Sequence, residues 1–408
     1  MTLYEELKWR GLIKDVTSPE LENKLNNEKL IFYIGTDPTA DSMHIGHYSS
    51  FLIAKRLAKA GHKPILLIGG ATGRIGDPRP TTEREMKSIE EIEKNTKNLK
   101  KQAEEIFGFE VVDNYDWIKN INIIEFLRDY GKYFNINYML DKDIIRRRLE
   151  TGITFTEFSY MLLQSLDFLH LHETRGVNLQ VAGSDQWGNI TSGVDLIRKK
   201  LGDEVYAFTM PLILDQNGKK FGKSEGNALW LDKNKTSSYE LYQYLINTDD
   251  SMIESYLKVF TFLSPEEIMD IVSKHNNEPH LRLGQKTLAR EIITDLHGKE
   301  EYEKAVQISE NLFSGNIKEI NVNDLMIGLK DVPHFILKDE SLLDLLVNNN
   351  ICSSKREARE FLGNNAISVN GEIVNDENMF IDKTKTIEGK IVVIRRGKKK
   401  YYVGLVEE

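Results

Sequence analysis

The sequence predicts an α/β protein, with a doubly wound, Rossmann-like domain followed by an all-α domain and a small α+β domain. Three observations lead to this prediction. β-favouring runs alternate with amphipathic helical runs over the first half of the chain. From Ser237 to Phe313 only helical patterns occur, and an Asn-Gly hairpin pattern follows near the C-terminus. Alternation of strand and helix indicates a parallel sheet covered by helices.

The first strand, turn and helix set the frame of the first domain. Leu30 to Ile34 is a β-favouring run that Gly35 breaks, and from His44 the apolar residues fall on one helical face until Gly61. A second apolar run, Pro64 to Ile68, follows at once. The unit is therefore a βαβ unit with a ligand crevice at its strand ends, where the helix N-terminus suits phosphate.

The same alternation continues through the rest of the first domain. In chain order we expect a long helix over Thr81 to Gly108, a strand at Glu110 to Val112, inserted helices over Asp116 to Arg148, a helix over Phe155 to Leu169, a strand at Leu179 to Gly183, a helix over Ile190 to Leu201, a strand at Ala207 to Leu214 and a polar loop over Asp215 to Asn227.

Changes of pattern divide the chain into four parts. We predict a Rossmann-like domain with a helical insertion over residues 1–230, a helical domain over 231–320, a weakly patterned linker over 321–338 and an α+β domain over 339–408. The last part combines two short helical patterns with alternating apolar residues around Asn370-Gly371, a dipeptide typical of two-residue hairpin turns.

Composition restricts the class of protein. The 408 residues are 40% hydrophobic and 29% charged, as in ordinary soluble proteins of two to four domains. No apolar run approaches the roughly 20 residues that span a bilayer, and we expect a cytoplasmic protein with no membrane partner. The single cysteine, Cys352, is expected in a core. A net charge of −9 excludes a protein that coats nucleic acid over its whole surface, but Arg395 to Lys400 form a local basic patch.

The tetrapeptide His44-Ile45-Gly46-His47 begins the first long helix. Two imidazoles one turn apart can donate hydrogen bonds to a phosphate, and Gly46 leaves room for a flat base. Ordinary surface histidines at a helix start are the alternative. The tetrapeptide resembles the HIGH signature of class I aminoacyl-tRNA synthetases, and the longer stretch Tyr33 to His47 resembles the tyrosyl-tRNA synthetases of bacterial type.

A second stretch strengthens this resemblance. Lys220-Phe221-Gly222-Lys223-Ser224 lies in the polar loop after the last strand. Alone it would read as a solvated loop, but after the first signature it is similar to the family's KMSKS signature, with Phe-Gly in place of Met-Ser. The resemblance covers nearly the whole chain. It implies activation of L-tyrosine by ATP and transfer of the tyrosine to tRNA(Tyr).

The resemblance also implies roles for individual residues in activation. A tyrosine carboxylate attacks the α-phosphate of ATP, so cations and N–H donors are needed rather than a general base. The implied catalytic residues are Thr39, His44, His47, Lys220, Lys223 and Ser224. Further ATP contacts, shared in part with that set, are Gly35, Asp37, His44, Gly46, His47, Gly183, Asp185, Gln186 and Lys223. Magnesium accompanies the nucleotide, and neither a permanently bound cofactor nor a protein metal site is expected.

The tyrosine site is expected where polar groups lie in apolar surroundings, because a buried donor or acceptor is costly unless a ligand satisfies it. By resemblance, Tyr33 and Asp167 bind the phenol hydroxyl. Asp77, Tyr160, Gln164 and Gln180 complete the tyrosine site. Tyr160, Gln164 and Asp167 share one helix face, since they are spaced i, i+4 and i+7. The alternative is that Tyr160 and Gln164 only line a core.

One segment departs from the family. After Asp77-Pro78 a lysine of the family's mobile loop is missing, Arg84 keeps the place of an arginine, and whether Arg79 replaces the lysine stays open. The C-terminal part resembles an RNA-binding module first named in a small-subunit ribosomal protein. Its expected RNA contacts are Lys355, Arg356, Arg359, Lys398, Lys399 and Lys400, and a solvated basic tail is the alternative for the last three.

Two other functions stay open beside this one. A tryptophanyl-tRNA synthetase should lack the pair Tyr33 and Asp167, and a non-catalytic RNA-binding relative should have lost one of the two signatures. Neither loss is seen in the sequence. The resemblance further implies a homodimer.

Overall fold

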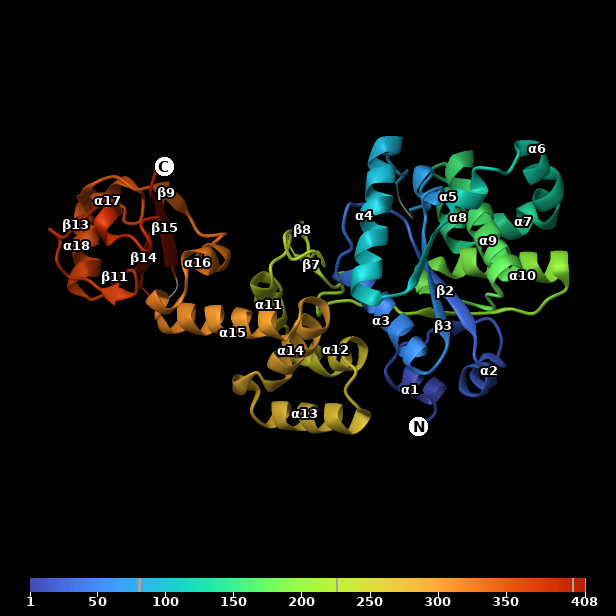
Figure 1. Ribbon diagram of the computed structural model, residues 1–408, viewed down its shortest axis with the longest axis horizontal. Helices are drawn as coiled ribbons and strands as arrows, with labels where there is room; N and C mark the ends of the chain where they lie inside the picture. The colour runs from blue at the N-terminus through green and yellow to red at the C-terminus, as the bar shows by residue number, and fades with distance from the viewer. Residues whose placement is uncertain (80–81, 225–226, 398–399, 408) are drawn as a thin grey trace. The chain divides into compact units, whose positions relative to one another are not determined.

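The computed structural model describes residues 1–79, 82–224, 227–397 and 400–407. The chain forms two compact units, each built from two segments (Figure 1). Unit 1 comprises Met1–Thr236 and Thr248–Glu291, and unit 2 comprises Ser237–Asn247 and Ile292–Glu408. The chain therefore passes from one unit to the other after residues 236, 247 and 291.

Unit 1 is organised around a six-stranded sheet. In spatial order its strands are β1 (Asp15–Val16), β6 (Tyr206–Met210), β5 (Leu179–Gly183), β2 (Ile31–Thr36), β3 (Lys63–Ile68) and β4 (Glu110–Asp113). All neighbouring pairs are parallel except β1 with β6. The connections run outward in opposite directions from β2 and β5, so the sheet is doubly wound and its switch point lies between these two strands. The predicted fold class is confirmed, and only the short edge strand β1 was missed.

Helices cover both faces of this sheet. The helices α3 (Ile45–Lys59) and α4 (Ile89–Phe107) lie on one side, and α9 (Phe155–Arg175) and α10 (Trp187–Leu201) lie on the other (Figure 1). Strand residues such as Phe32 and Leu66 are fully buried between them. The prediction for α4 was wrong at its start: Ser88 caps the helix by accepting a hydrogen bond from the Glu91 amide, and Met86, 70% exposed, precedes it.

The remaining helices of unit 1 lie before, within and after the sheet region. At the N-terminus are α1 (Leu3–Trp9) and α2 (Leu21–Asn27). The predicted insertion forms α5 (Tyr115–Ile118), α6 (Ile123–Glu125), α7 (Ile136–Leu140) and α8 (Asp143–Arg148). Later in the chain than the sheet come α12 (Ile253–Phe260), α13 (Pro265–Asn277) and α14 (Leu283–His297). The last residues of α14 belong to unit 2.

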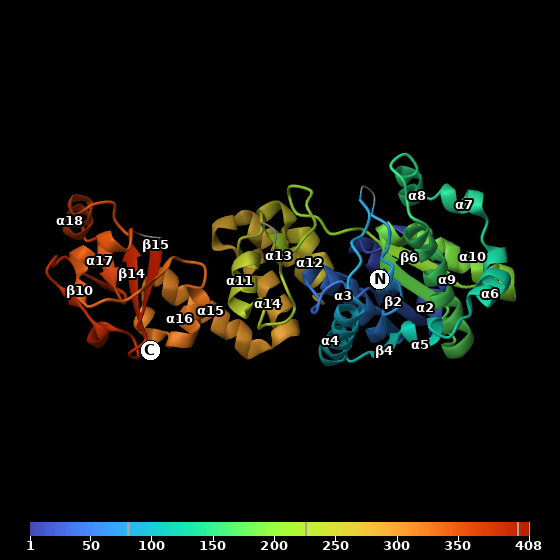
Figure 2. The ribbon, with the colours of Figure 1, turned by 90° about the horizontal axis from the view of Figure 1, so that it is seen from above.

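Unit 2 contains a second sheet with helices on both of its faces (Figure 2). Its strand order is β12 (Glu372–Ile373), β11 (Ile367–Val369), β14 (Ile391–Arg396), β15 (Lys400–Leu405) and β9 (His334–Ile336). Alternate residues of β14 separate two cores. Val392 and Ile394 pack with α17 (Leu342–Asn348) and α18 (Lys355–Gly363), whereas Ile391 and Val393 pack with α15 (Lys299–Ser314) and α16 (Val322–Gly328).

Two local predictions for unit 2 are confirmed. Asn370 and Gly371 both have positive φ, at 50° and 88°, and they join the antiparallel strands β11 and β12 as a two-residue hairpin turn requires. A Cβ on Gly371 would also come within 2.4 Å of the Gly315 carbonyl oxygen. Cys352 lies in the core beside α17 and α18, and burial raises the pKa of its thiol.

The segment 321–338 differs from the predicted linker. It contains α16 and β9, and β9 pairs in parallel with β15 from Val403↔His334 to Leu405↔Ile336. Leu325 and Leu329 are buried in the core that also holds Val403. This segment is therefore an integral part of unit 2. Within the described residues, no helix combines the length and the apolar character that a membrane crossing requires.

Candidate active site

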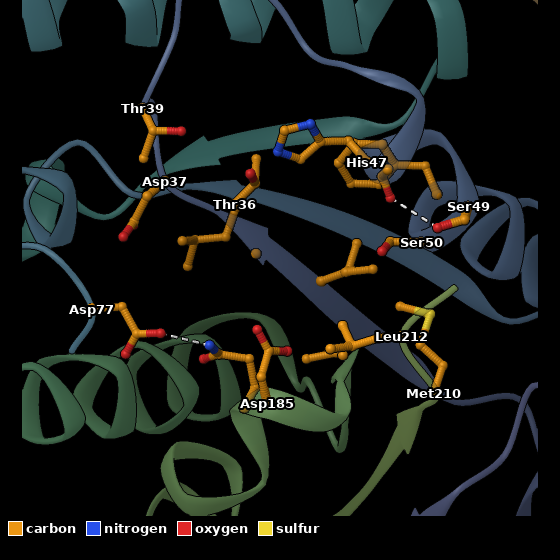
Figure 3. Close-up of a pocket in the computed structure, with 18 of the residues that line it drawn as sticks. Thr36, Asp37, Thr39, His47, Ser49, Ser50, Asp77, Asp185, Met210 and Leu212 are labelled. Carbon is orange, nitrogen blue, oxygen red and sulfur yellow. Dashed lines mark hydrogen bonds between the residues drawn. The ribbon is translucent and has the colours of Figure 1, made fainter. Parts of the chain in front are cut away.

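A cavity of about 370 Å³ opens at the carboxyl ends of β2 and β5, the switch point of the sheet. Every residue expected in the tyrosine and ATP sites whose side chain is described lines it, as do Thr39 and Lys220. Figure 3 shows Asp37, Thr39 and Asp77 toward one side of this cavity and Met210 and Leu212 toward the other. The cavity thus gathers residues that lie far apart in the sequence.

The first signature forms a reciprocal helix cap. His44 is the N-cap of α3, and its Nδ1 accepts a hydrogen bond from the Gly46 amide at 3.1 Å. His47 Nδ1 accepts in turn from the His44 amide at 3.1 Å. Burial lowers the pKa of His47 to about 3, so its imidazole is neutral. Because each Nδ1 accepts a hydrogen bond, each ring carries its proton on Nε2.

The fold itself requires a glycine at position 46, apart from the space that Gly46 leaves for a nucleotide base. A Cβ at this position would lie 2.8 Å from Cε1 of the His44 ring, which folds back over the helix start. Ser49 also contributes to this turn by donating its hydroxyl to the Gly46 carbonyl at 2.8 Å. The tetrapeptide therefore fixes two imidazoles against the first turn of α3 while leaving that turn close to the cavity.

The segment after the second signature is hydrogen-bonded through its backbone to both signatures, since the Leu229 amide donates to the Gly222 carbonyl at 3.0 Å. The Ile45 amide donates to Leu229 O at 2.9 Å, and Leu231 N donates to Met43 O at 2.8 Å. Gly222 has φ +81°, and a Cβ there would fall 1.8 Å from Ile45 Cγ2. Gly222 is thus required by both conformation and contact.

Of the two lysines in the second signature, the structure describes the side chain of Lys220. Lys220 is exposed and lines the cavity. Lys223 and Ser224 form strand β7 (Lys223–Ser224), which pairs with β8 (Asn227–Ala228). Their side chains lie outside the described part of the structure, so their predicted roles stay predictions.

The closed end of the cavity holds the predicted phenol pair. Asp167 is 1% exposed and accepts hydrogen bonds from Asn114 Nδ2 and Trp117 Nε1, each at 3.0 Å. Burial raises the pKa of Asp167 to about 8, against these two hydrogen bonds, which lower it. Tyr33 is equally buried, and its hydroxyl has no hydrogen-bond partner among the described residues. A buried hydroxyl without a partner is costly, which favours a ligand that supplies one.

Two further carboxylates lie between the ends of the cavity. Asp77 accepts from Gln186 Nε2 at 2.7 Å and from Asn189 Nδ2 at 3.1 Å, and burial raises its pKa to about 7. Asp37 accepts from the Tyr160 hydroxyl at 2.8 Å, and burial raises its pKa as well. These groups are held by neutral donors rather than by cations, so the cavity suits a positively charged ammonium group.

The polar residues that donate hydrogen bonds to the predicted carboxylates were not identified from the sequence. Asn114 and Trp117 bind Asp167, Thr72 donates to Asp37 at 2.7 Å, and Asn189 binds Asp77. Asn114 directly follows β4, and a polar residue at the carboxyl end of a parallel strand was the available signal. The other three gave no signal of their own.

The departing segment lies beside a second cavity of about 400 Å³. Arg84 lines both cavities and donates from Nε to the Asp77 carbonyl at 2.8 Å. Arg79 lines only the second one, which shares Asp37, Thr39 and Arg84 with the first. The question of whether Arg79 replaces the missing lysine therefore concerns this second cavity.

The predicted RNA contacts of unit 2 are exposed where they are described. Lys355 is paired with Asp344 at 2.6 Å, and Arg359 is paired with Glu377. Arg356 is exposed and has no ion-pair partner among the described residues. Lys400 begins β15, whereas Lys398 and Lys399 lie outside the described residues. No group of three or more His, Cys, Asp or Glu side chains that could hold a metal ion occurs in the part of the chain that the structure describes.

Comparison with protein families gives two matches that together cover most of the chain. The model described as tRNA synthetases class I (W and Y) matches residues 25–314. The model described as the tyrosine–tRNA ligase SYY-like C-terminal domain matches residues 324–404.

Individual relatives agree with these matches. The tyrosine–tRNA ligase of Listeria monocytogenes serotype 4a (strain HCC23) is 50% identical over 415 residues, covering 99% of both chains. That of Macrococcus caseolyticus (strain JCSC5402) is 50% identical over 410 residues, covering 98% of both. Among solved structures, a C-terminally truncated mitochondrial tyrosyl-tRNA synthetase of Aspergillus nidulans superposes with a TM-score of 0.67 and 34% identity, covering 76% of this chain and 94% of its own.

The family matches and the identity over the full length indicate the same family, and the cavity at the switch point is consistent with it. This chain therefore belongs to the class I tRNA synthetases, in the family of the tyrosine–tRNA ligases.

Proposed function

We propose that this chain activates L-tyrosine with ATP and transfers the tyrosine to the 3′ end of tRNA(Tyr). The observation that carries the proposal is the closed end of the cavity, where the Tyr33 hydroxyl, without a partner in the described part of the chain, lies in the same lining as the carboxylate of Asp167. A phenol can both donate to and accept from such a pair. Full-length identity to tyrosine–tRNA ligases supports the same substrate.

In the first step a carboxylate oxygen of tyrosine bonds to the α-phosphorus of ATP. The bond from that phosphorus to the β-bridging oxygen breaks, and pyrophosphate leaves with both electrons. No proton moves, so catalysis consists of positioning and charge stabilisation. In the second step a terminal ribose hydroxyl of tRNA bonds to the tyrosyl carbonyl carbon, the bond from that carbon to the phosphate oxygen breaks, and AMP leaves together with the hydroxyl proton.

The residues of the open end fit the first step. His47 offers an Nε2–H donor, and His44 places its imidazole beside the N-terminus of α3, where the helix dipole favours anions. Lys220 adds a cation from the facing loop, and Thr39 adds a hydroxyl. We assign Lys223 and Ser224 to the same end by family resemblance. Magnesium enters with the nucleotide, since its preference for phosphate oxygens and water removes the need for a protein cage.

The residues between the two ends fit the amino-acid backbone and the ribose. Asp77, Tyr160 and Gln164 surround the place for the ammonium group, and Gln180 lies next to them in the lining. Gly35, Asp37 and Gly46 are assigned to the nucleotide side of β2 and α3. Gly183, Asp185 and Gln186 are assigned to the ribose, because they follow the carboxyl end of β5.

Exchange of labelled pyrophosphate into ATP tests the substrate. We expect exchange that depends on tyrosine, is absent with tryptophan and is strongly reduced with phenylalanine. Asp270→Ala removes an exposed carboxylate on α13 and serves as a matched control that should behave as the parent chain does. Exchange driven by tryptophan in place of tyrosine would contradict the proposal.

We also propose that the chain acts as a homodimer through its insertion. Large apolar side chains stand exposed there, including Ile123 at 64%, Ile124 at 65% and Leu127 at 53%. Such clusters mark interaction surfaces. Light scattering should give twice the chain mass, and Ile124→Lys with Leu127→Lys should give the single mass. A dimer that survives both substitutions would place the interface elsewhere.

For tRNA we propose that α18 and the start of β15 contact phosphates. Lys355 and Arg359 are held only in surface ion pairs, which are weak enough for phosphates to replace. Arg356→Ala or Lys400→Ala should lower tRNA affinity and reduce the salt dependence by about one ion each. Lys299→Ala, 77% exposed on α15, is the control. Equal losses of tRNA affinity in all three variants would contradict the proposed contacts, because they would show only an effect of total charge.

The functional division proposed for the chain is catalysis by residues 1–230, an anticodon-side role for the helices of 231–320 and RNA binding by 339–408. The shared core of unit 2 limits how this is tested, because a cut near Lys338 would strip Val393 and Val403 from Leu325. Point substitutions are therefore preferable to truncation. A cytoplasmic location is proposed on the composition and on the single cysteine, which lies buried.

A further inference from the structure

The backbone at Arg79, Thr82 and Arg84 is held by a buried ion pair that the chemistry above does not use. Arg148, the last residue of α8, is paired with Glu157 at 2.9 Å, and their side chains are 4% and 2% exposed. Arg148 belongs to the insertion, and Glu157 lies in the first turn of α9. The pair therefore connects the insertion to the helix that carries the tyrosine-site residues.

The backbone of the departing segment is fastened to both members of this pair. Arg148 donates from one terminal nitrogen to the carbonyls of Arg79 and Thr82, at 3.0 Å each. Glu157 Oε1 accepts from the Arg84 amide at 3.3 Å. Arg148 Nε also donates to the Gly152 carbonyl at 3.1 Å. The planar guanidinium fork is thus divided among three carbonyls and a carboxylate, an arrangement that a lysine cannot reproduce.

A buried ion pair of this kind is poor evidence for a gain in stability. The cost of removing two charges from water offsets most of their attraction, and well-packed apolar replacements are often neutral. Conformational specificity is the better explanation here, because the partners of the pair are backbone atoms of a loop. Those atoms would otherwise bind water, and the loop would be free to take other positions.

The held segment leads directly to a cavity cation. The Arg84 side chain lies over Gly76, since a Cβ on that glycine would meet Arg84 Cβ at 3.2 Å. Its Nε donates to the Asp77 carbonyl, and the side chain lines both cavities. Fixing the Arg84 amide and the carbonyls before it therefore fixes where this guanidinium can reach.

We propose that Arg148 and Glu157 are positioning residues for the activation step, which hold Arg79, Thr82 and Arg84 so that Arg84 stays at the junction of the two cavities. This rests on the proposed function, in which that end of the site receives the phosphates of ATP. The insertion thereby acts on phosphate chemistry through one buried guanidinium, without touching the nucleotide.

The test compares Arg148→Met and Arg148→Lys with Arg146→Met in the full chain. Arg146 is the matched control, an arginine on the same helix that is 62% exposed and paired with Asp143. Stopped-flow fluorescence gives the rate of adenylate formation and the dissociation constants for tyrosine and ATP. We expect both Arg148 variants to lose about 10-fold to 100-fold in rate through misplacement of Arg84, with tyrosine affinity within about twofold of the parent. Arg146→Met should stay within about twofold in all constants.

The same substitutions on an Arg84→Ala background show whether the effect runs through Arg84. There Arg148→Met should cost less than about twofold more, because residues acting as a unit are not additive. An equal loss on both backgrounds would overturn the proposal. An unchanged rate in Arg84→Ala alone would overturn the proposal too, because Arg84 would then take no part in the activation step. A parent chain that forms no tyrosyl adenylate would instead contradict the proposed function.

Hydrogen exchange keeps the positioning claim independent of activity. In Arg148→Lys, which retains the buried charge, the Arg84 amide should exchange at least about tenfold faster than in the parent, while the amides of β2 keep their protection. Unchanged protection of Arg84 would overturn the proposal. Global loss of protection in Arg148→Met together with normal protection and rate in Arg148→Lys would do so as well, since the pair would then serve the fold alone.

Discussion

The two ends of the active-site cavity are built in different ways. At the closed end, Tyr33 and Asp167 lie on a strand and a helix, each 1% exposed, and Asn114 and Trp117 hold the carboxylate. At the open end, Thr39 and Lys220 stand exposed on turns and loops. The closed end is complete before any ligand arrives, whereas the open end presents donors that only a ligand can bring together. Substitutions at the closed end should therefore change tyrosine affinity, and those at the open end should change rate.

The largest effect is expected for Asp167→Ala. The phenol loses its carboxylate partner, and Asn114 and Trp117 are left with unpaired buried donors. Tyrosine should bind more weakly by about 3 kcal/mol, roughly 150-fold in the dissociation constant. Equilibrium fluorescence titration measures this. Asp185→Ala, across the cavity, should leave tyrosine affinity within about twofold, and similar losses in both variants would erase the distinction between the ends.

His47→Ala tests the open end. Its Nε2–H is lost, and the His44 amide loses the acceptor that completes the cap of α3. The rate of adenylate formation should fall about 30-fold, or 2 kcal/mol, with tyrosine affinity nearly unchanged. Stopped-flow kinetics separate the two quantities. A loss of tyrosine affinity at an unchanged rate would show that His47 acts at the closed end and that its assignment to the open end is wrong.

The two ends should also impose opposite pH dependences on stability. The folded pKa of Asp167, about 8, exceeds the unfolded value near 3.8, so the folded state binds more protons and this carboxyl makes stability fall as pH rises through that window. The folded pKa of His47, about 3, lies below 6.5, so this imidazole makes stability rise from about pH 3 to 6.5.

Urea unfolding between pH 5 and 8 measures both slopes. Asp167→Asn should remove a decline of about 2 kcal/mol between pH 6 and 8, and His47→Ala should flatten the rise below pH 6.5. If Asp167→Asn left the fall in unfolding free energy between pH 6 and 8 unchanged, a different carboxyl group would cause that fall. Asp77 would be the next candidate because its pKa is about 7.

The smallest effect is expected for Tyr33→Phe. Asp167 still binds the phenol, so tyrosine affinity should fall by only about 1 kcal/mol, roughly fivefold. The ligand-free protein should become more stable by a similar amount, because a buried hydroxyl without a partner is removed. Thermal unfolding with and without tyrosine checks both signs. A lower unfolding midpoint without ligand would mean that the hydroxyl has a partner.

How far the sequence predicted the molecule depends on the range of the interaction. The βαβ unit and the Asn370-Gly371 hairpin follow from local patterns, and they were predicted correctly. The partners of Asp167 were missed because Asn114 and Trp117 lie 53 and 50 residues away. Strand β9 was missed for the same reason, since its partner β15 is remote in sequence and two of its three residues are exposed. Side chains that line the cavity were easier to predict than the side chains that hold them in place.

The crossings of the chain between its two units have a consequence during synthesis. Helix α11 (Ser238–Ile246) leaves the ribosome before the last segment of unit 1, but it packs in unit 2, where Gln243 bonds to Ser309 and Tyr242 lies against Tyr302. At about 5–20 residues per second, α11 waits several seconds for α15 to emerge. Its apolar face, with Leu241 and Leu245, is bare during that interval. A nascent chain halted near residue 300 should therefore be a chaperone substrate, whereas one halted after α15 has left the ribosome should not.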